Sequence, residues 1–429
     1  MHGSPSQVRP ASLSYLDCRI RGDPPVRKGL QLILLGMMGR TPFAGVAWQV
    51  LHYLEGFRRL GCDVYYVEDT GDWPYDPEQN TVTGDSSYTV NYIGRLMDWC
   101  ELGDRWAYRA ASEGGRTFGL SESQLSHLFE RADALVNLTG ATVLRDEHLR
   151  VPMRIYLETD PVLPQIEVAQ GRQFTIDVLS AHTHHFTYGE NLGAPDCGIP
   201  LQRFNYRPTR QPVVLEWWTP AAGLSPSGSR QLPTGGRFTT ISSWQQSGKD
   251  IEWNGETYTW RKDLEFLKFI DLPHRTSQPL ELALAPGDAG ATRSFAQAME
   301  LLTSHGWSVV DAIALSRDIL PYRDYILNSY GEFTVAKDQY TRLRSGWFSD
   351  RSVCYLAAGR PVITQETGFS NFLPTGRGLF AFRTMEDILE AIQEINADYD
   401  QHSKAALEVA HEYFAAERVL ASMMERAGL

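Results

Sequence analysis

The sequence predicts an α/β fold built from two successive halves, each with a parallel sheet flanked by helices. Short apolar runs alternate with amphipathic stretches along most of the 429 residues. Both halves open in the same way, with an apolar strand (30–35 and 238–242) followed by a long polar loop. Strands that alternate with helices are typical of parallel sheets covered on both faces.

The first half follows this pattern in order. Residues 1–28 are rich in Pro, Ser, Gly and Arg and are expected to form a flexible arm. The first domain is expected over residues 29–200. Its strands are predicted at 30–35, 63–68, 134–139 and 154–157, and its helices at 46–60 and 88–111.

A stretch rich in Pro, Gly, Arg and Ser, 201–236, is predicted to be the crossing into the second domain. That domain is expected over 237–405. Its strands are predicted at 238–242, 280–285, 333–336 and 362–364, and its helices at 263–270, 294–305 and 322–329. A last helix, predicted over 403–426, is long enough for residues 406–429 to pack back on the first domain.

The composition excludes several classes of protein. Lys and Arg number 40 against 52 Asp and Glu, and the net charge of −12 disfavours nucleic acid or a bare anionic membrane as the main partner. Five scattered cysteines without a CxxC pair argue against a disulfide framework and a structural zinc site. No apolar run approaches the roughly 20 residues of a membrane span. We expect a cytoplasmic protein of unspecified oligomeric state.

The loop that follows the first strand carries glycines at Gly36, Gly39 and Gly45. This spacing is wider than the GxGxxG pattern of dinucleotide-binding proteins. A long loop that also holds Arg40 and Phe43 suits an approaching substrate better than a tightly held dinucleotide. The alternative is that its glycines only permit sharp turns.

Residues 332–368 predict a strand, a polar loop, a helix that starts after Ser349, and a second strand. Gly359 is expected to end the helix, and Pro361 prevents its continuation. Cations, an aromatic residue and a glycine share the loop, at the carboxyl end of the first strand, where ligands bind in open α/β sheets. The free N–H groups at the helix start suit a phosphate, although most such helix starts bind only water.

The segment from Ala358 to Gly368 (AGRPVITQETG), with the predicted helix start Ser349–Ser352 before it, resembles the carboxyl-terminal half of B-type glycosyltransferases. It resembles more closely the group related to spore-maturation glycosyltransferase-like proteins, as do residues 42–49 and 65–69. The resemblance implies two Rossmann-like domains that face each other across a cleft. The second would hold a nucleoside-diphosphate sugar such as a UDP-sugar, and the first an acceptor.

One departure from the family pattern is Cys354, which stands where retaining members place a Glu for the donor ribose. A thiol cannot accept hydrogen bonds from two hydroxyls as a carboxylate does. Either Asp350 or Glu366 serves instead, or donor binding is altered or lost. The expected function is sugar transfer to a small-molecule or cell-envelope hydroxyl. The alternatives are a non-catalytic sugar-nucleotide-binding protein and an NAD-dependent enzyme.

Sugar transfer requires cations for the leaving diphosphate, an aromatic slot for the base, and for an inverting course a carboxylate or His near the acceptor. Asp160, at the end of a strand and before Pro161, is the predicted base, with Glu158 as the second choice. The predicted acceptor residues are Gly39, Arg40, Phe43, Gly45 and His184. The predicted donor residues are Ser243, Trp244, Lys249, Lys337, Tyr340, Arg344, Trp347, Asp350, Arg351, Ser352, Glu366, Thr367 and Gly368. No DxD motif is placed to hold a metal, and no permanently bound cofactor is expected.

Overall fold

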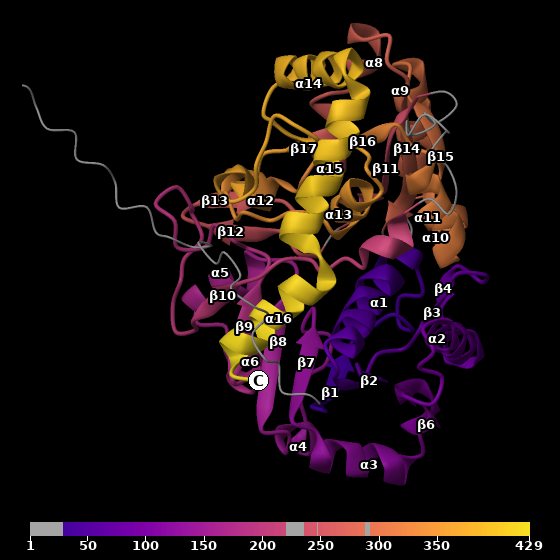
Figure 1. Ribbon diagram of the computed structural model, residues 1–429, viewed down its shortest axis with the longest axis vertical. Helices are drawn as coiled ribbons and strands as arrows, with labels where there is room; N and C mark the ends of the chain where they lie inside the picture. Colours follow the sequence, from indigo (N-terminus) through magenta and orange to yellow (C-terminus); the bar gives the residue numbers. More distant parts are fainter. Residues whose placement is uncertain (1–28, 220–235, 247, 288–291) are drawn as a thin grey trace, which may run out of the picture.

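The computed structural model describes residues 29–219, 236–246, 248–287 and 292–429 (Figure 1). The predicted arm 1–28 and part of the predicted crossing lie outside the described residues. The chain forms two α/β halves, stacked one above the other in Figure 1, each around its own sheet. None of the described helices has the length and apolar character needed to cross a membrane.

The first sheet has eight strands, and every neighbouring pair is parallel except β5 and β6. Its order is β10 (Tyr206–Pro208), β9 (His184–Thr187), β8 (Met153–Glu158), β7 (Ala134–Leu138), β1 (Gln31–Leu35), β2 (Asp63–Glu68), β5 (Trp106–Ala110) and β6 (Arg116–Gly119). The sheet extends past the expected boundary at 200, because β10 pairs with β9.

The second sheet has six strands, all paired in parallel. Its order is β15 (Ser308–Asp311), β14 (Leu280–Gly287), β11 (Phe238–Gln245), β16 (Gly331–Thr334), β17 (Val362–Gln365) and β18 (Leu379–Phe382). Two small hairpins lie apart from the sheets, β3 (Tyr75–Asp76) with β4 (Thr81–Val82) and β12 (Ile251–Trp253) with β13 (Glu256–Tyr258).

Helices connect the strands and cover the sheets. In the first half they are α1 (Ala44–Arg59), α2 (Ser87–Trp99), α3 (Glu122–Arg131), α4 (Asp146–Leu149), α5 (Leu163–Ala169) and α6 (Gln173–Ser180). In the second half they are α7 (Asp263–Leu267), α8 (Leu272–Arg275), α9 (Thr292–Ser304), α10 (Ala312–Ser316), α11 (Ile319–Leu327), α12 (Asp338–Arg342), α13 (Asp350–Ala357), α14 (Met385–Ala397), α15 (Tyr399–Phe414) and α16 (Ala416–Ala427). Short 3-10 turns are η1 (Ala111–Glu113), η2 (Leu215–Trp218) and η3 (Phe369–Asn371).

The central strands are buried on both faces, which explains why they read as apolar runs in the sequence. Residues Leu32 to Leu35 of β1 are all at most 1% exposed. Phe333 and Ile363 occupy the equivalent place in the second sheet and are also 1% exposed or less. Each sheet therefore brings the carboxyl ends of its strands to one edge, from which the connecting loops leave.

The chain returns to the first domain at its end (Figure 1). Instead of one helix over 403–426, α15 and α16 are separated by Ala415, which has an extended backbone. The reason is a pairing with the crossing, since Val213 N donates to Phe414 O (2.7 Å) and Ala416 N donates to Val213 O (2.9 Å). Helix α16 then packs on α1, where Leu420 lies against Gly56.

Two further predictions of secondary structure differ from the structure. The helix predicted over 88–111 ends at Trp99, and residues 106–110 form β5, because they pair with β2. The aromatic residues there favour a strand as readily as a helix. Strand β16 also begins two residues earlier than predicted, and the loop after it contains α12.

Candidate functional site

The two halves meet where β8 ends and α12 begins. Tyr340 on α12 donates a hydrogen bond from its hydroxyl to Asp160 Oδ1 (2.5 Å). Trp347 Nε1 donates to the carbonyl oxygen of Thr159 (2.9 Å). The rings of Tyr340 and Trp347 stack, with centroids 4.6 Å apart. Predicted residues from both halves are thus in direct contact at the junction.

Three lysines, Lys249, Lys262 and Lys337, gather at this junction and are called the lysine cluster. Lys337 Nζ lies 3.5 Å from Asp160 Oδ1 and 3.0 Å from the centroid of the Trp260 ring. The ammonium of Lys249 lies 4.5 Å from the same ring. Lys262 Nζ lies 6.0 Å from the Trp347 ring. All three follow strand ends or precede α7, at the carboxyl edge of the second sheet.

The cations of this cluster are only partly neutralised. Within the part of the chain that the structure describes, Lys249 and Lys262 form no ion pair with a carboxylate. Burial lowers the pKa of Lys337 to about 8, although Asp160 acts in the opposite direction. Burial, followed by Arg351 and Lys337, holds the pKa of Lys262 well below its usual value. An anion placed here would relieve this repulsion.

Lys262 was missed by the sequence analysis. It lies in Trp260-Arg-Lys262, just before α7 and far in sequence from Trp347 and Lys337. An aromatic residue two positions before a lysine was the only local signal. Its place in the cluster depends on the fold of the connection between β11 and α7.

Several predicted donor residues do not face open space. The Tyr340 ring is fully buried and Trp244 packs on Phe266 in the core, so neither provides a wall for a base. The half-buried Trp347 remains available. Ser243 lies within β11, where its backbone pairs with Ala285.

The start of α13 differs from the predicted phosphate site. Arg351 is bound to Glu332 (2.6 Å), to Thr334 Oγ1 (2.8 Å) and to the carbonyl oxygen of Ile241 (2.5 Å). The Ser352 hydroxyl is buried and has no hydrogen-bond partner among the described residues. Both residues therefore belong to the interior of the second domain.

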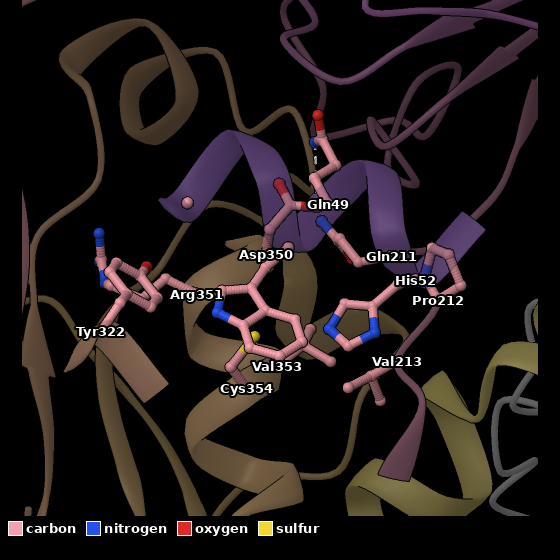
Figure 2. A pocket seen from close by; sticks show the side chains of 12 residues that line it. Gln49, His52, Gln211, Pro212, Val213, Tyr322, Asp350, Arg351, Val353 and Cys354 are labelled. Carbon is pink, nitrogen blue, oxygen red and sulfur yellow. Dashed lines mark hydrogen bonds between the residues drawn. The ribbon is translucent and has the colours of Figure 1, made fainter. Parts of the chain in front are cut away.

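Helix α13 starts against α1 of the first domain, and a narrow pocket lies between the two helices (Figure 2). The volume available there to the centre of a water molecule is about 10 Å³, which is room for about one water. This pocket is therefore too small for a diphosphate; the anion site predicted at the start of α13 stays a prediction, and the lysine cluster is a second candidate.

Another group of predicted donor residues joins the two domains. Arg344 Nε donates to Asp196 Oδ2 (2.8 Å), and its Nη1 lies 3.6 Å from Glu366 Oε1. Gly368 N donates to Glu366 Oε1 (2.5 Å), and Thr367 Oγ1 donates to the carbonyl oxygen of Trp347 (2.6 Å). These contacts hold a turn against the first domain instead of lining an open slot.

Asn191 of the first domain binds this turn through hydrogen bonds. Its Nδ2 donates to the carbonyl oxygen of Arg344 (2.8 Å), and its backbone N donates to Ser345 O (3.2 Å). Gly346 (φ +80°) and Gly368 (φ +98°) lie so close to it that a Cβ would come within 2.3 and 2.8 Å of Asn191 atoms. Only glycine allows this approach.

The predicted acceptor loop is tied to the first sheet. Gly39 N and Arg40 N donate to the two carboxylate oxygens of Glu68 (2.7 and 2.5 Å). Burial raises the pKa of Glu68 to about 7, although Tyr66 and these two N–H groups lower it. The Arg40 side chain pairs with Asp72 at 3.2 Å. The loop therefore has a fixed shape.

Of three further predicted acceptor residues, Gly45 lies near the second domain and Phe43 near the hairpin β3–β4, whereas His184 lies near neither. A Cβ on Gly45 would lie 3.6 Å from the hydroxyl of Tyr322 on α11. The Phe43 ring lies 5.6 Å from that of Tyr75. His184 begins β9, level with Ile155, whereas Thr187 is level with Glu158. It therefore lies toward the opposite edge of the sheet and does not join the site.

The two predicted catalytic carboxylates have different surroundings. Glu158 accepts from Gln165 Nε2 and Thr187 Oγ1, is 2% exposed, and has its pKa raised to about 8 by burial. Asp160 has a side chain that is 39% exposed. Partial burial raises its pKa, but Lys337, Lys249 and Tyr340 outweigh that effect and hold the pKa below the usual value. Asp160 is thus ionised and already paired.

One group of potential metal ligands occurs among the described residues, Asp69, Glu147 and His148. Arg109 donates to Asp69 (2.8 Å) and to Glu147 (2.5 Å), and Arg145 also donates to Asp69. Two guanidinium groups already occupy the positions of a cation. This group acts as an ion-pair network.

Comparison with known proteins places the fold. No protein-family model matches the chain, and no curated protein matches it. An α-glucosyltransferase solved with UDP and a 13-mer DNA containing a HMU base aligns with a TM-score of 0.55 at 10% identity, over 94% of this chain and 100% of that one. AviGT4, a glycosyltransferase involved in avilamycin A biosynthesis, aligns with a TM-score of 0.51 at 12% identity, over 93% and 97%. The predicted fold, two Rossmann-like domains of the B type, is confirmed.

Proposed function

We propose that this protein, which has the fold of B-type glycosyltransferases, transfers a sugar from a nucleoside diphosphate to an acceptor hydroxyl. One observation carries the proposal. Among the described residues, Lys249 and Lys262 have no carboxylate within ion-pair distance, and both lie at the carboxyl edge of the second sheet, beside the first domain. In α/β folds of this kind that edge binds the ligand.

The chemistry of the cluster fits the leaving group of sugar transfer. A diphosphate gains negative charge as the bond to the sugar breaks, and fixed cations nearby stabilise that charge. Lys262 and Lys337 are half-buried and buried, and a diphosphate bound beside them would favour their charged forms, whose charges water screens less than surface charges. The half-buried ring of Trp347 offers a flat surface for a base.

We propose a UDP-sugar as the donor, since the α-glucosyltransferase of similar fold was solved with UDP. The acceptor is a hydroxyl of a small molecule or a cell-envelope precursor. A net charge of −12 supports such an acceptor over DNA, with which that α-glucosyltransferase was solved. Catalysis without a resident metal or cofactor, and a place in the cytoplasm, complete the proposal.

A binding panel tests the donor class. UDP, dTDP, GDP and NAD are titrated calorimetrically into the wild type, into K262M and into K404M. Lys404 is an exposed lysine of α15 and serves as the matched control. We expect UDP to bind the wild type and K404M equally, and K262M about 10-fold or more weakly, because a charge-assisted contact is lost.

The results of these titrations distinguish sugar transfer from the two competing functions. Equal UDP affinity of all three proteins would remove the lysine cluster as the donor site. Binding of NAD alone would support an NAD-dependent enzyme. Nucleotide binding without any turnover of the sugar donor would support a non-catalytic binding protein, for which Cys354, in place of the family's Glu, is the supporting observation.

A further inference from the structure

Four of the predicted site residues carry a carboxyl group, and three of these groups are engaged. Glu158 accepts from two side chains, Asp160 is paired with Lys337 and Tyr340, and Glu366 is 3% exposed beside Arg344. The fourth, Asp350, has one interdomain contact, from Gln49 Nε2 to its Oδ1 (3.1 Å). It is therefore the carboxyl group with most capacity left to accept a proton.

Asp350 borders the narrow pocket between α1 and α13 (Figure 2). Gly45 and Gln49 line it from the first domain, and Tyr322 from the second. Because the pocket has room for about one water, it can also take a hydroxyl group of that size. It connects the end of the predicted acceptor loop with the second domain.

Asp350 also lies next to the second sheet, at whose edge the donor is proposed to bind. Its chain neighbour Arg351 reaches the middle of β11 and the end of β16, through Ile241 O and Thr334 Oγ1. Consecutive Cα atoms are about 3.8 Å apart. Asp350 thus lies one residue from a side chain that reaches the second sheet, and close enough to Asp160, the partner of Lys337, to be affected by its charge.

We propose that Asp350, rather than Asp160, is the base that accepts the proton of the acceptor hydroxyl; this inference rests on the proposed function. In a direct displacement, the acceptor oxygen forms a bond to the anomeric carbon of the donor and its proton passes to the Asp350 carboxylate. The bond from that carbon to the diphosphate oxygen breaks, and its electron pair leaves with the diphosphate. The lysine cluster stabilises the negative charge of the released diphosphate.

The acidity of the group agrees with this role. Burial raises the pKa of Asp350 to about 7, the hydrogen bond from Gln49 lowers it, and the nearby charge of Asp160 raises it. A base is most effective when its pKa is near the working pH. Burial lowers the pKa of His52, which lines the same pocket, to about 3, so that it stays neutral there. The titratable or charged groups around Asp350 are Arg351, Cys354, Tyr53, His52, Tyr322, Tyr340, Tyr188 and Asp160.

The experiment measures UDP release from UDP-glucose, with water as the acceptor, as a function of pH. For the wild type we expect kcat/KM to fall tenfold per pH unit below about pH 7, because Asp350 becomes protonated. D350N should lose about 100-fold or more of the plateau rate and the pH-dependent limb with it. It should still bind UDP with wild-type affinity and keep its unfolding temperature.

Two more variants separate a base from a merely structural residue. Q49A removes the donor to Asp350 and should move the limb to higher pH, whereas D160N removes a nearby negative charge and should move it to lower pH. Hydrolysis by D350N with the limb intact would overturn this inference alone. A wild type that binds UDP but cleaves no donor would overturn the proposed function, and the inference with it.

Discussion

Replacing Lys337 by Met tests whether this lysine serves binding at the expense of stability. The side chain is 10% exposed and contacts Asp160 and the ring of Trp260. Its pKa is lowered from 10.5 to about 8, mainly by burial. A charge that is costly to bury and is nonetheless retained indicates a role other than packing.

The magnitudes follow from these contacts. Holding the ammonium charged costs about 3 kcal/mol of folding free energy, at about 1.4 kcal/mol per pH unit. The contact with Trp260 returns roughly 2 kcal/mol. The variant K337M should therefore be about as stable as the wild type or about 1 kcal/mol more stable. Its UDP affinity should fall about 10- to 150-fold, since a charge-assisted hydrogen bond contributes about 1.5–3 kcal/mol.

Denaturant unfolding and calorimetry with UDP measure the two quantities on the same samples. A pH series adds a signature of the charge itself. Between about pH 8 and 10.5 the unfolded chain binds a proton at Lys337 that the folded protein does not. The unfolding free energy of the wild type should therefore rise with pH relative to that of K337M in this range. Above about pH 8 the wild type should also bind UDP more weakly.

A K337M protein that unfolds several kcal/mol more easily and binds UDP as the wild type does would refute a binding role of Lys337. Lys337 would then be a structural partner of Asp160 and Trp260. K337R keeps a positive charge above pH 8 and is the matched control. It should retain UDP binding without the loss at high pH.

Two further predictions concern packing. G346A should destabilise the protein by about 2 kcal/mol or more in denaturant unfolding, because a Cβ would come within 2.3 Å of Asn191 N. In the control G376A a Cβ would have no described atom within 4 Å, so this variant should lose only about 1 kcal/mol through backbone strain. Equal losses for both would mean that the contact with the first domain is unimportant. L420A should lower the free energy of unfolding by about 2–5 kcal/mol, because the Leu420 side chain is fully buried against α1. Its control L320A, at a residue that is 40% exposed, should lower it by less than about 1 kcal/mol. Similar values for the two variants would argue against the packing of α16 on the first domain.

The sequence was a good guide wherever a local pattern is sufficient. Strand β2 has the predicted bounds 63–68, and helix α13 begins after Ser349 as expected. Gly359 adopts the left-handed conformation expected at a helix end. By contrast, residues 106–110 pair with a strand and Ala415 pairs with the crossing, and no local pattern encodes a partner far along the chain.

The sequence by itself determined the two α/β halves, the strands at their centres and the loops that carry the charged residues, because apolar periodicity and helix signals are local. The tertiary structure decided which of those charges are available. Glu332 occupies Arg351 and Asp196 binds Arg344, while Lys262, from a distant segment, joins Lys337. A charge is available to a ligand only when no nearby residue neutralises it, and that depends on which segments the fold brings together.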